Sequence, residues 1–145
     1  MFTLRSDKFI WLGAGHSRGH AAMDGFGLFD KLTGTLVTDD YNGYQKYGLN
    51  LLARGLCNIH LIRSARGVGD ADPGLRAWSE AAIEMLRAAR QAVITAQSEG
   101  RMALTDTEIE EIRTNYLAVM DSGIEQVGNR RWHGDKRHPG LVLAQ

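Results

Sequence analysis

Two adjacent carboxylates, Asp39 and Asp40, have the sequence context in this chain that is best suited to chemistry. They follow residues 34–38, a run rich in β-branched side chains that favours a strand. Open α/β sheets place their ligand sites at the carboxyl ends of strands, where a carboxylate can hold a metal ion. The alternative is that the aspartates cap the aromatic-rich helix expected at 41–47, with Asp40 as the N-cap residue. Only one of them can be the cap, so the role of the other stays open.

Other candidate sites have weaker support. Cys57 and His60 have a metal-ligand spacing, and His133 and His138 would supply two more ligands for tetrahedral zinc. The two pairs lie far apart in the chain, so a buried cysteine and a polar histidine are the better interpretation of the first pair. The sequence has no G-x-S-x-G nucleophile motif, and the glycines within 67–69 are too few for a phosphate-binding loop.

The composition describes a globular protein without a charge excess. The 145 residues are enough for one domain or part of one, 43% are hydrophobic, and 17 basic side chains balance 17 acidic ones. Cys57 is the only cysteine, which excludes an internal disulfide and fits a reducing compartment. The sequence has neither a membrane-length apolar run nor a recognisable signal peptide. We therefore expect a cytoplasmic protein that does not bind a membrane.

Strand and helix signals alternate in the part of the chain that must position Asp39. We expect strands at 1–4, 8–13, 34–38 and 51–57, the first two as a hairpin, and helices at 21–29, 41–47 and from 58 onward. This order predicts a mixed sheet in an α/β protein.

The character of the sequence changes at residue 67. A glycine-containing loop is expected at 67–74, followed by one-sided helices at 75–99 and 105–123 that would form an antiparallel hairpin. Gly100 is expected to end the first helix, and Thr105 with Glu108 to form a capping box at the start of the second. From residue 128 the chain loses its periodicity, and Arg130, Arg131, Lys136 and Arg137 make it basic, so we expect a disordered tail.

Three stretches, 18–28, 34–44 and 56–63, together resemble the insertion-sequence sixty-six family of bacterial transposases. In that family an acid-bearing strand with an aromatic turn precedes a Cys-x-x-His-x-x-Arg segment, and a long helical insertion follows. The resemblance implies a partial ribonuclease-H-like core at 1–66, a helical insertion at 67–127 and a basic tail at 128–145. It also implies Asp-Asp-Glu catalysis, in which carboxylates hold Mg²⁺ or Mn²⁺ ions for attack on DNA phosphates at transposon ends.

The resemblance also implies roles for single residues. Asp39 matches the second acid of the catalytic triad, as a catalytic residue and metal ligand, which would leave Asp40 as the helix cap. Tyr44 belongs to the aromatic turn, and Cys57 begins the second motif. The cations and the histidine near these motifs, namely Arg18, His60 and Arg63, are expected to contact DNA.

The sequence departs from the family pattern at both ends. The first acid lies on a family strand upstream of the hairpin, Asp7 sits in a turn and cannot replace it, and the third acid would lie beyond Gln145. In the ribonuclease-H-like arrangement the strand of the first acid lies between the hairpin and the Asp39 strand. We therefore expect a transposase fragment that is inactive alone, with a marginally stable or aggregation-prone sheet.

Two other functions are compatible with the sequence. The chain would be a non-catalytic protein that pairs with intact transposase, with DNA or with itself, if it keeps the fold only for binding. It would be an unrelated metal-dependent hydrolase if an acid partner for Asp39 existed, and the sequence offers none.

Overall fold

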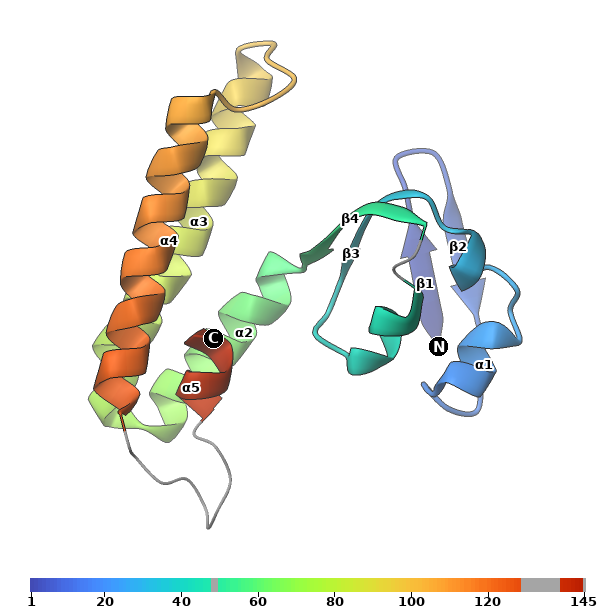
Figure 1. Ribbon diagram of the computed structural model, residues 1–145, viewed down its shortest axis with the longest axis horizontal. Helices are drawn as coiled ribbons and strands as arrows, with labels where there is room; N and C mark the ends of the chain where they lie inside the picture. The colour runs from blue at the N-terminus through green and yellow to red at the C-terminus, as the bar shows by residue number, and fades with distance from the viewer. Residues whose placement is uncertain (48–49, 129–138, 145) are drawn as a thin grey trace. The chain divides into compact units, whose positions relative to one another are not determined.

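The computed structural model describes residues 1–47, 50–128 and 139–144. The chain divides into two compact units, Met1–Cys57 and Asn58–Gln145. The first unit holds small sheets and short helices, whereas the second is helical (Figure 1). The expected α/β class is therefore confirmed at this level.

The first unit begins with the expected β-hairpin. β1 (Phe2–Arg5) pairs antiparallel with β2 (Ile10–Gly13), in a register that runs from Phe2 opposite Gly13 to Arg5 opposite Ile10. Ser6 makes the turn: its hydroxyl accepts hydrogen bonds from the N–H groups of Lys8 and Phe9 at 3.2 and 3.1 Å. The side chain of Ser6 thus supplies turn chemistry that its residue type favours.

The remaining elements of the first unit lead to a second strand pair. They are α1 (His20–Asp24), the 3₁₀ helix η1 (Phe29–Lys31), β3 (Gly34–Thr38), the 3₁₀ helix η2 (Asn42–Tyr47) and β4 (Leu51–Leu56). β3 and β4 are parallel, and the connection between them contains η2. The helix expected at 21–29 is shorter than predicted because glycines follow Asp24, and Gly27 has a φ of 60° that interrupts helical geometry.

The strands described form two two-stranded sheets rather than one mixed sheet. β1 pairs with β2 and β3 with β4, and no backbone ladder joins the pairs in the described part of the unit. The sheet implied by the family resemblance would need a further strand between β1 and β3. A mainly aromatic core holds the unit together instead: Phe2, Phe29 and Tyr47 are buried with Met23, and Trp11 packs edge-on against Phe26 at 5.0 Å.

The second unit is built on two long helices. Its elements are α2 (Asn58–Ala71), the 3₁₀ helix η3 (Pro73–Leu75), α3 (Arg76–Ser98), α4 (Asp106–Val127) and α5 (Pro139–Ala144). α3 and α4 lie side by side and run antiparallel, as the sequence predicted (Figure 1). The indole of Trp78 is buried between them and donates a hydrogen bond to the carbonyl of Val119 at 2.8 Å.

The link between α3 and α4 follows its sequence signals. Gly100 has a φ of 75°, which suits glycine after a helix end. Thr105 and Glu108 form the predicted capping box: the Thr105 hydroxyl accepts from the N–H of Glu108, and the Glu108 carboxylate accepts from the N–H of Thr105. Arg101 closes the turn with ion pairs to Glu99 and Glu108 at 2.9 and 2.8 Å.

Two sequence predictions in this unit are wrong. The loop expected from residue 67 begins only after Ala71, because α2 continues through Gly67 and Gly69, with Val68 and Gly69 buried in the unit. α4 likewise continues past Gly123 to Val127, because Gly123 lies directly against the ring of Trp78.

The tail is described only in part. Arg130, Arg131, Lys136 and Arg137 lie outside the described residues, as do His133 and His138. Residues 139–144 form α5, with Leu143 packed against the core of the second unit. Part of the segment that the sequence predicted to be disordered is therefore helical.

Candidate functional site

Asp39 lies just past the end of β3, as the sequence predicted. Because β3 and β4 are parallel, their carboxyl ends reach the same edge of the small sheet. The N–H of Cys57, which follows β4, donates a hydrogen bond to the carbonyl of Thr38 at 2.7 Å. Asp39 and Cys57, which belong to two different stretches of the family resemblance, therefore follow the ends of neighbouring strands.

Arg18 and the turn after β3 surround the carboxylate of Asp39. Arg18 Nη2 donates to Asp39 Oδ2 at 2.8 Å, and the N–H of Tyr41 donates to Asp39 Oδ1 at 3.2 Å. The guanidinium of Arg18 also lies over the ring of Tyr41, 4.7 Å from its centroid. Both carboxylate oxygens of Asp39 thus have a donor, one of them cationic.

Tyr44 completes this cluster. Its ring meets Tyr41 edge-on at 5.7 Å and stacks with Phe29 at 6.4 Å. The hydrogen bond to Asp39, and secondly one to Tyr44, raise the pKa of Arg18 above its ordinary value. The structure therefore brings together three residues that the sequence singled out separately, namely Arg18, Asp39 and Tyr44.

Asp39, not Asp40, supplies the side-chain oxygen that orders the turn before η2. The bond from the N–H of Tyr41 to Asp39 Oδ1 is the two-residue pattern with which aspartate side chains order a following turn. η2 begins only at Asn42, the side chain of Asp40 is exposed, and within the described residues Asp40 accepts no capping hydrogen bond. The sequence predicted a helix that starts at Tyr41, for which Asp40 would be the N-cap residue. η2 starts one residue later, at Asn42, so Asp40 does not hold the N-cap position.

His60 and Arg63 lie in the first turns of α2, and both are exposed. Their spacing of three residues places them on one face of the helix. Cys57, which precedes α2, is partly buried. α2 belongs to the second unit, so the structure does not place His60 and Arg63 relative to Asp39.

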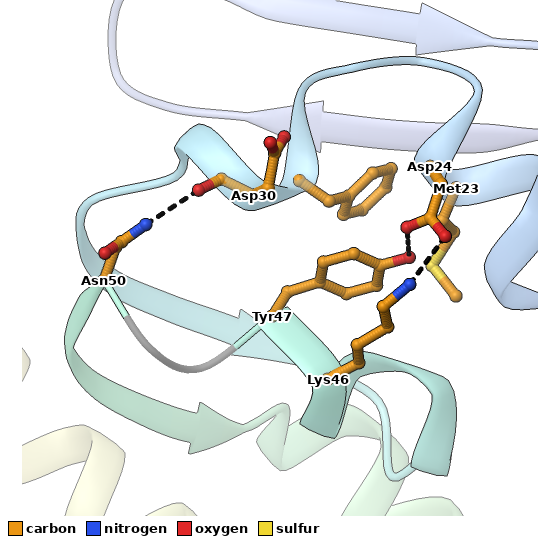
Figure 2. Close-up of a pocket in the computed structure, with 7 residues that line it drawn as sticks. Met23, Asp24, Asp30, Lys46, Tyr47 and Asn50 are labelled. Atoms are coloured by element: carbon orange, nitrogen blue, oxygen red, sulfur yellow. Dashed lines mark hydrogen bonds and ion pairs between the residues drawn. The ribbon is translucent and has the colours of Figure 1, made fainter.

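A second polar cluster of the first unit was not predicted from the sequence. Lys46 Nζ contacts Asp24 Oδ2 at 2.6 Å, and the hydroxyl of Tyr47 donates to Asp24 Oδ1 at 2.7 Å (Figure 2). These groups line a cavity of about 380 Å³ together with Met23, Phe29, Asp30 and Asn50. The contacts join α1 to η2 across more than twenty residues, so no local spacing could have indicated them.

The charges in this cluster neutralise one another. The hydrogen bond from Lys46, and then that from Tyr47, lower the pKa of Asp24 below its ordinary value. Burial, and secondly the bond to Asp24, raise the pKa of Tyr47 to about 12. Because both oxygens of Asp24 already have donors inside the protein, the cluster acts as a structural brace between α1 and η2.

The chain also matches a known family over most of its length. The family model described as Transposase IS66 family matches residues 1–139. The chain belongs to this transposase family. No curated protein and no solved structure matches it at a significant level. In the described part of this transposase-family chain, none of the helices has the length and apolar character needed to cross a membrane.

Transposases of this kind generally work with a divalent metal, which makes Asp39 the residue to test for a fit. Among the residues described in this IS66-family chain, no group of three or more histidine, cysteine, aspartate or glutamate side chains is arranged to hold a metal ion. Asp39 instead faces the guanidinium of Arg18 and the N–H of Tyr41. The described residues therefore do not fit a divalent-metal site at Asp39.

Proposed function

We propose that this chain is a partial catalytic domain of an IS66-family transposase and does not cleave or join DNA by itself. The observation that carries the proposal is the family match over residues 1–139, which includes the stretch containing Asp39. Asp39 takes the position of the second acid of an Asp-Asp-Glu triad in a ribonuclease-H-like core. DNA at transposon ends is the corresponding substrate of the intact enzyme.

The surroundings of Asp39 support the proposed lack of activity. Two-metal phosphoryl transfer needs several carboxylates that clamp the attacking and leaving oxygens. Within the described residues, Asp39 is joined by a guanidinium and a backbone N–H rather than by further acids. One carboxylate in an ion pair has neither the charge nor the free oxygens to organise Mg²⁺ or Mn²⁺ for this reaction.

DNA contacts are proposed for the exposed face of α2. The side chains of His60 and Arg63 are exposed and lie three residues apart on α2, a spacing that suits contacts of both to DNA backbone phosphates. Arg18 is the third residue proposed to contact DNA, although its guanidinium also pairs with Asp39. Substituting Arg63 by glutamine is expected to weaken DNA binding at low salt, because phosphate contacts dominate nucleic-acid affinity.

The experiment that tests the proposal is a cleavage and strand-transfer assay on DNA carrying the ends of the element that encodes the chain. With Mg²⁺ or Mn²⁺ present, we expect no nicked or joined product, and the same result for Asp39→Asn. Product that forms with the wild-type chain and disappears in Asp39→Asn would overturn the proposed inactivity.

A second candidate function is a non-catalytic protein that pairs with an intact transposase of the same family. Exposed apolar side chains on the strands of the first unit favour it, since a partner would cover them. They are Ile10 and Leu12 of β2, Val37 of β3 and Leu56 of β4. Co-purification with the intact transposase, and inhibition of its strand transfer by added chain, would distinguish this function from an inert fragment.

A further inference from the structure

Two segments of the first unit that are far apart in sequence are fastened to each other by polar contacts. One segment is 18–20, at the start of α1, and the other is 39–43, after β3. Arg18 pairs with Asp39 at 2.8 Å and covers the ring of Tyr41, while His20 Nε2 lies 3.1 Å from the carbonyl oxygen of Gly43. Contacts of different chemistry thus join the same two segments.

We propose that Asp39 serves in this chain as the internal counter-ion of Arg18, fastening the start of α1 to the turn after β3, and not as a ligand for a divalent cation. The inference goes beyond the proposed function, which requires only that the chain does not cleave DNA. It assigns a positioning role to both residues. We call the contacts among Arg18, Asp39 and Tyr41 the Arg18 clamp.

The geometry of the clamp favours arginine over any other cation. A guanidinium can donate a hydrogen bond in its plane while its face lies on an aromatic ring, and Arg18 does both, to Asp39 and to Tyr41. The carboxylate is held as well, because the N–H of Tyr41 donates to its other oxygen. A hydrated divalent ion at this position would have to displace both donors, and the described residues hold no group of three or more acidic, histidine or cysteine side chains to compensate.

The neighbouring Asp40 provides a matched control. It carries the same charge one residue away, is exposed, and has no part in the clamp. If the effect of Asp39 were one of general charge, the two aspartates would behave alike. If the clamp exists, only Asp39 should matter to the stability of the first unit.

A double-mutant cycle on the full chain measures the clamp. We expect Arg18→Met and Asp39→Asn each to lower the urea midpoint, and the double variant to fall no further than the more affected single variant. Asp40→Asn should leave the midpoint unchanged, and Arg18→Lys should recover only part of the loss because lysine lacks the planar fork. Strictly additive effects, or equal effects of Asp39→Asn and Asp40→Asn, would overturn the proposal.

A second measurement needs no variant and remains informative if a substitution prevents folding. Mn²⁺ is titrated into the ¹⁵N-labelled wild-type chain, where it broadens the amide signals nearest to any bound ion. We expect no selective broadening of residues 37–41 at millimolar Mn²⁺. Selective broadening there would show that Asp39 binds the ion and would overturn the proposal, even if the DNA assay still gave no product.

Discussion

At the level of single residues, the fold changes the ionisation of the buried hydroxyl of Tyr47. Its side chain is 6% exposed, and its hydroxyl donates to Asp24 at 2.7 Å. Burial and this bond both favour the protonated phenol, so the pKa of Tyr47 rises from 10.0 to about 12. The folded chain thus holds this proton more tightly than the unfolded chain does. The resulting stabilisation is complete below about pH 10 and is lost as the pH rises towards 12.

We predict that one of the four tyrosines titrates later than the others. Ultraviolet absorbance of tyrosinate, followed while the pH is raised, should show this late step in the wild-type chain and not in Tyr47→Phe. Tyr116→Phe is the control, because Tyr116 is exposed on α4 and should leave the late step in place. A late step that persists in Tyr47→Phe would contradict the burial of this hydroxyl.

At the level of elements, two helical glycines should respond oppositely to the same substitution. Gly67 lies in α2 with nothing within 4 Å of the position that a Cβ would take, so Gly67→Ala gains helix propensity, about 0.5–1 kcal/mol. A Cβ on Gly123 of α4 would overlap the ring of Trp78. Gly123→Ala should therefore destabilise the helical unit by roughly 1–3 kcal/mol, despite the same gain in propensity.

Urea unfolding followed by far-ultraviolet circular dichroism measures both variants. Gly67→Ala serves as the matched control, since both positions are helical glycines and only one lies against an aromatic ring. A stabilised Gly123→Ala would mean that α3 and α4 separate more easily than their packing around Trp78 indicates.

The turn between α3 and α4 should make this element sensitive to acid. The ion pair with Arg101, and then the bonds from Thr105, lower the pKa of Glu108 from 4.5 to about 2. A carboxyl whose pKa is lowered by folding contributes stability above its ordinary pKa and loses it as the pH falls towards the lowered value. We predict that the wild-type chain loses stability between about pH 4.5 and 2, and that Glu108→Gln is less stable at neutral pH with a weaker acid dependence.

Thermal unfolding at several pH values tests this. Glu111→Gln removes a charge from the same helix, at an exposed position that makes no ion pair with any other described residue, and should keep the acid dependence of the wild type. Identical pH profiles for Glu108→Gln and the wild type would show that the turn contributes little to stability.

The same elements show which features of this chain can be predicted from its sequence. The hairpin turn at Ser6 and the capping box of Thr105 and Glu108 depend on neighbours within three residues, and both were predicted. The path of α2 through Gly67 depends on the burial of Val68 in the helical unit, which is tertiary packing that overrides a local glycine signal.

The sequence predicted individual residues of the candidate site but not the contacts between them. The position of Asp39 after a strand followed from β propensity, and Arg18 and Tyr44 were singled out for other reasons. Their meeting joins positions 21 residues apart in the case of Arg18 and Asp39, which no periodicity encodes. The brace of Asp24, Lys46 and Tyr47 was missed for the same reason.

At the level of the whole molecule, Ile10 and Leu12 on the outer face of the β1–β2 hairpin should govern association. Trp11 packs into the core of the first unit, whereas Ile10 and Leu12 alternate to the opposite face and are 66% and 63% exposed. β-branched and leucine side chains exposed next to each other on a strand favour pairing with another chain. We predict that the wild-type chain associates with itself as its concentration rises.

Replacing both residues by threonine keeps β propensity and removes most of the apolar surface. Sedimentation velocity over a range of concentrations should show the Ile10→Thr, Leu12→Thr variant shifted towards monomer, with an unchanged circular dichroism spectrum. Met102→Thr is the control: Met102 is fully exposed in the α3–α4 link and far in sequence from this face, so it should associate like the wild type. A wild-type chain that stays monomeric at every concentration would mean that this face is covered within the molecule or does not pair. The second candidate function, a non-catalytic binding protein, would then lose its structural support.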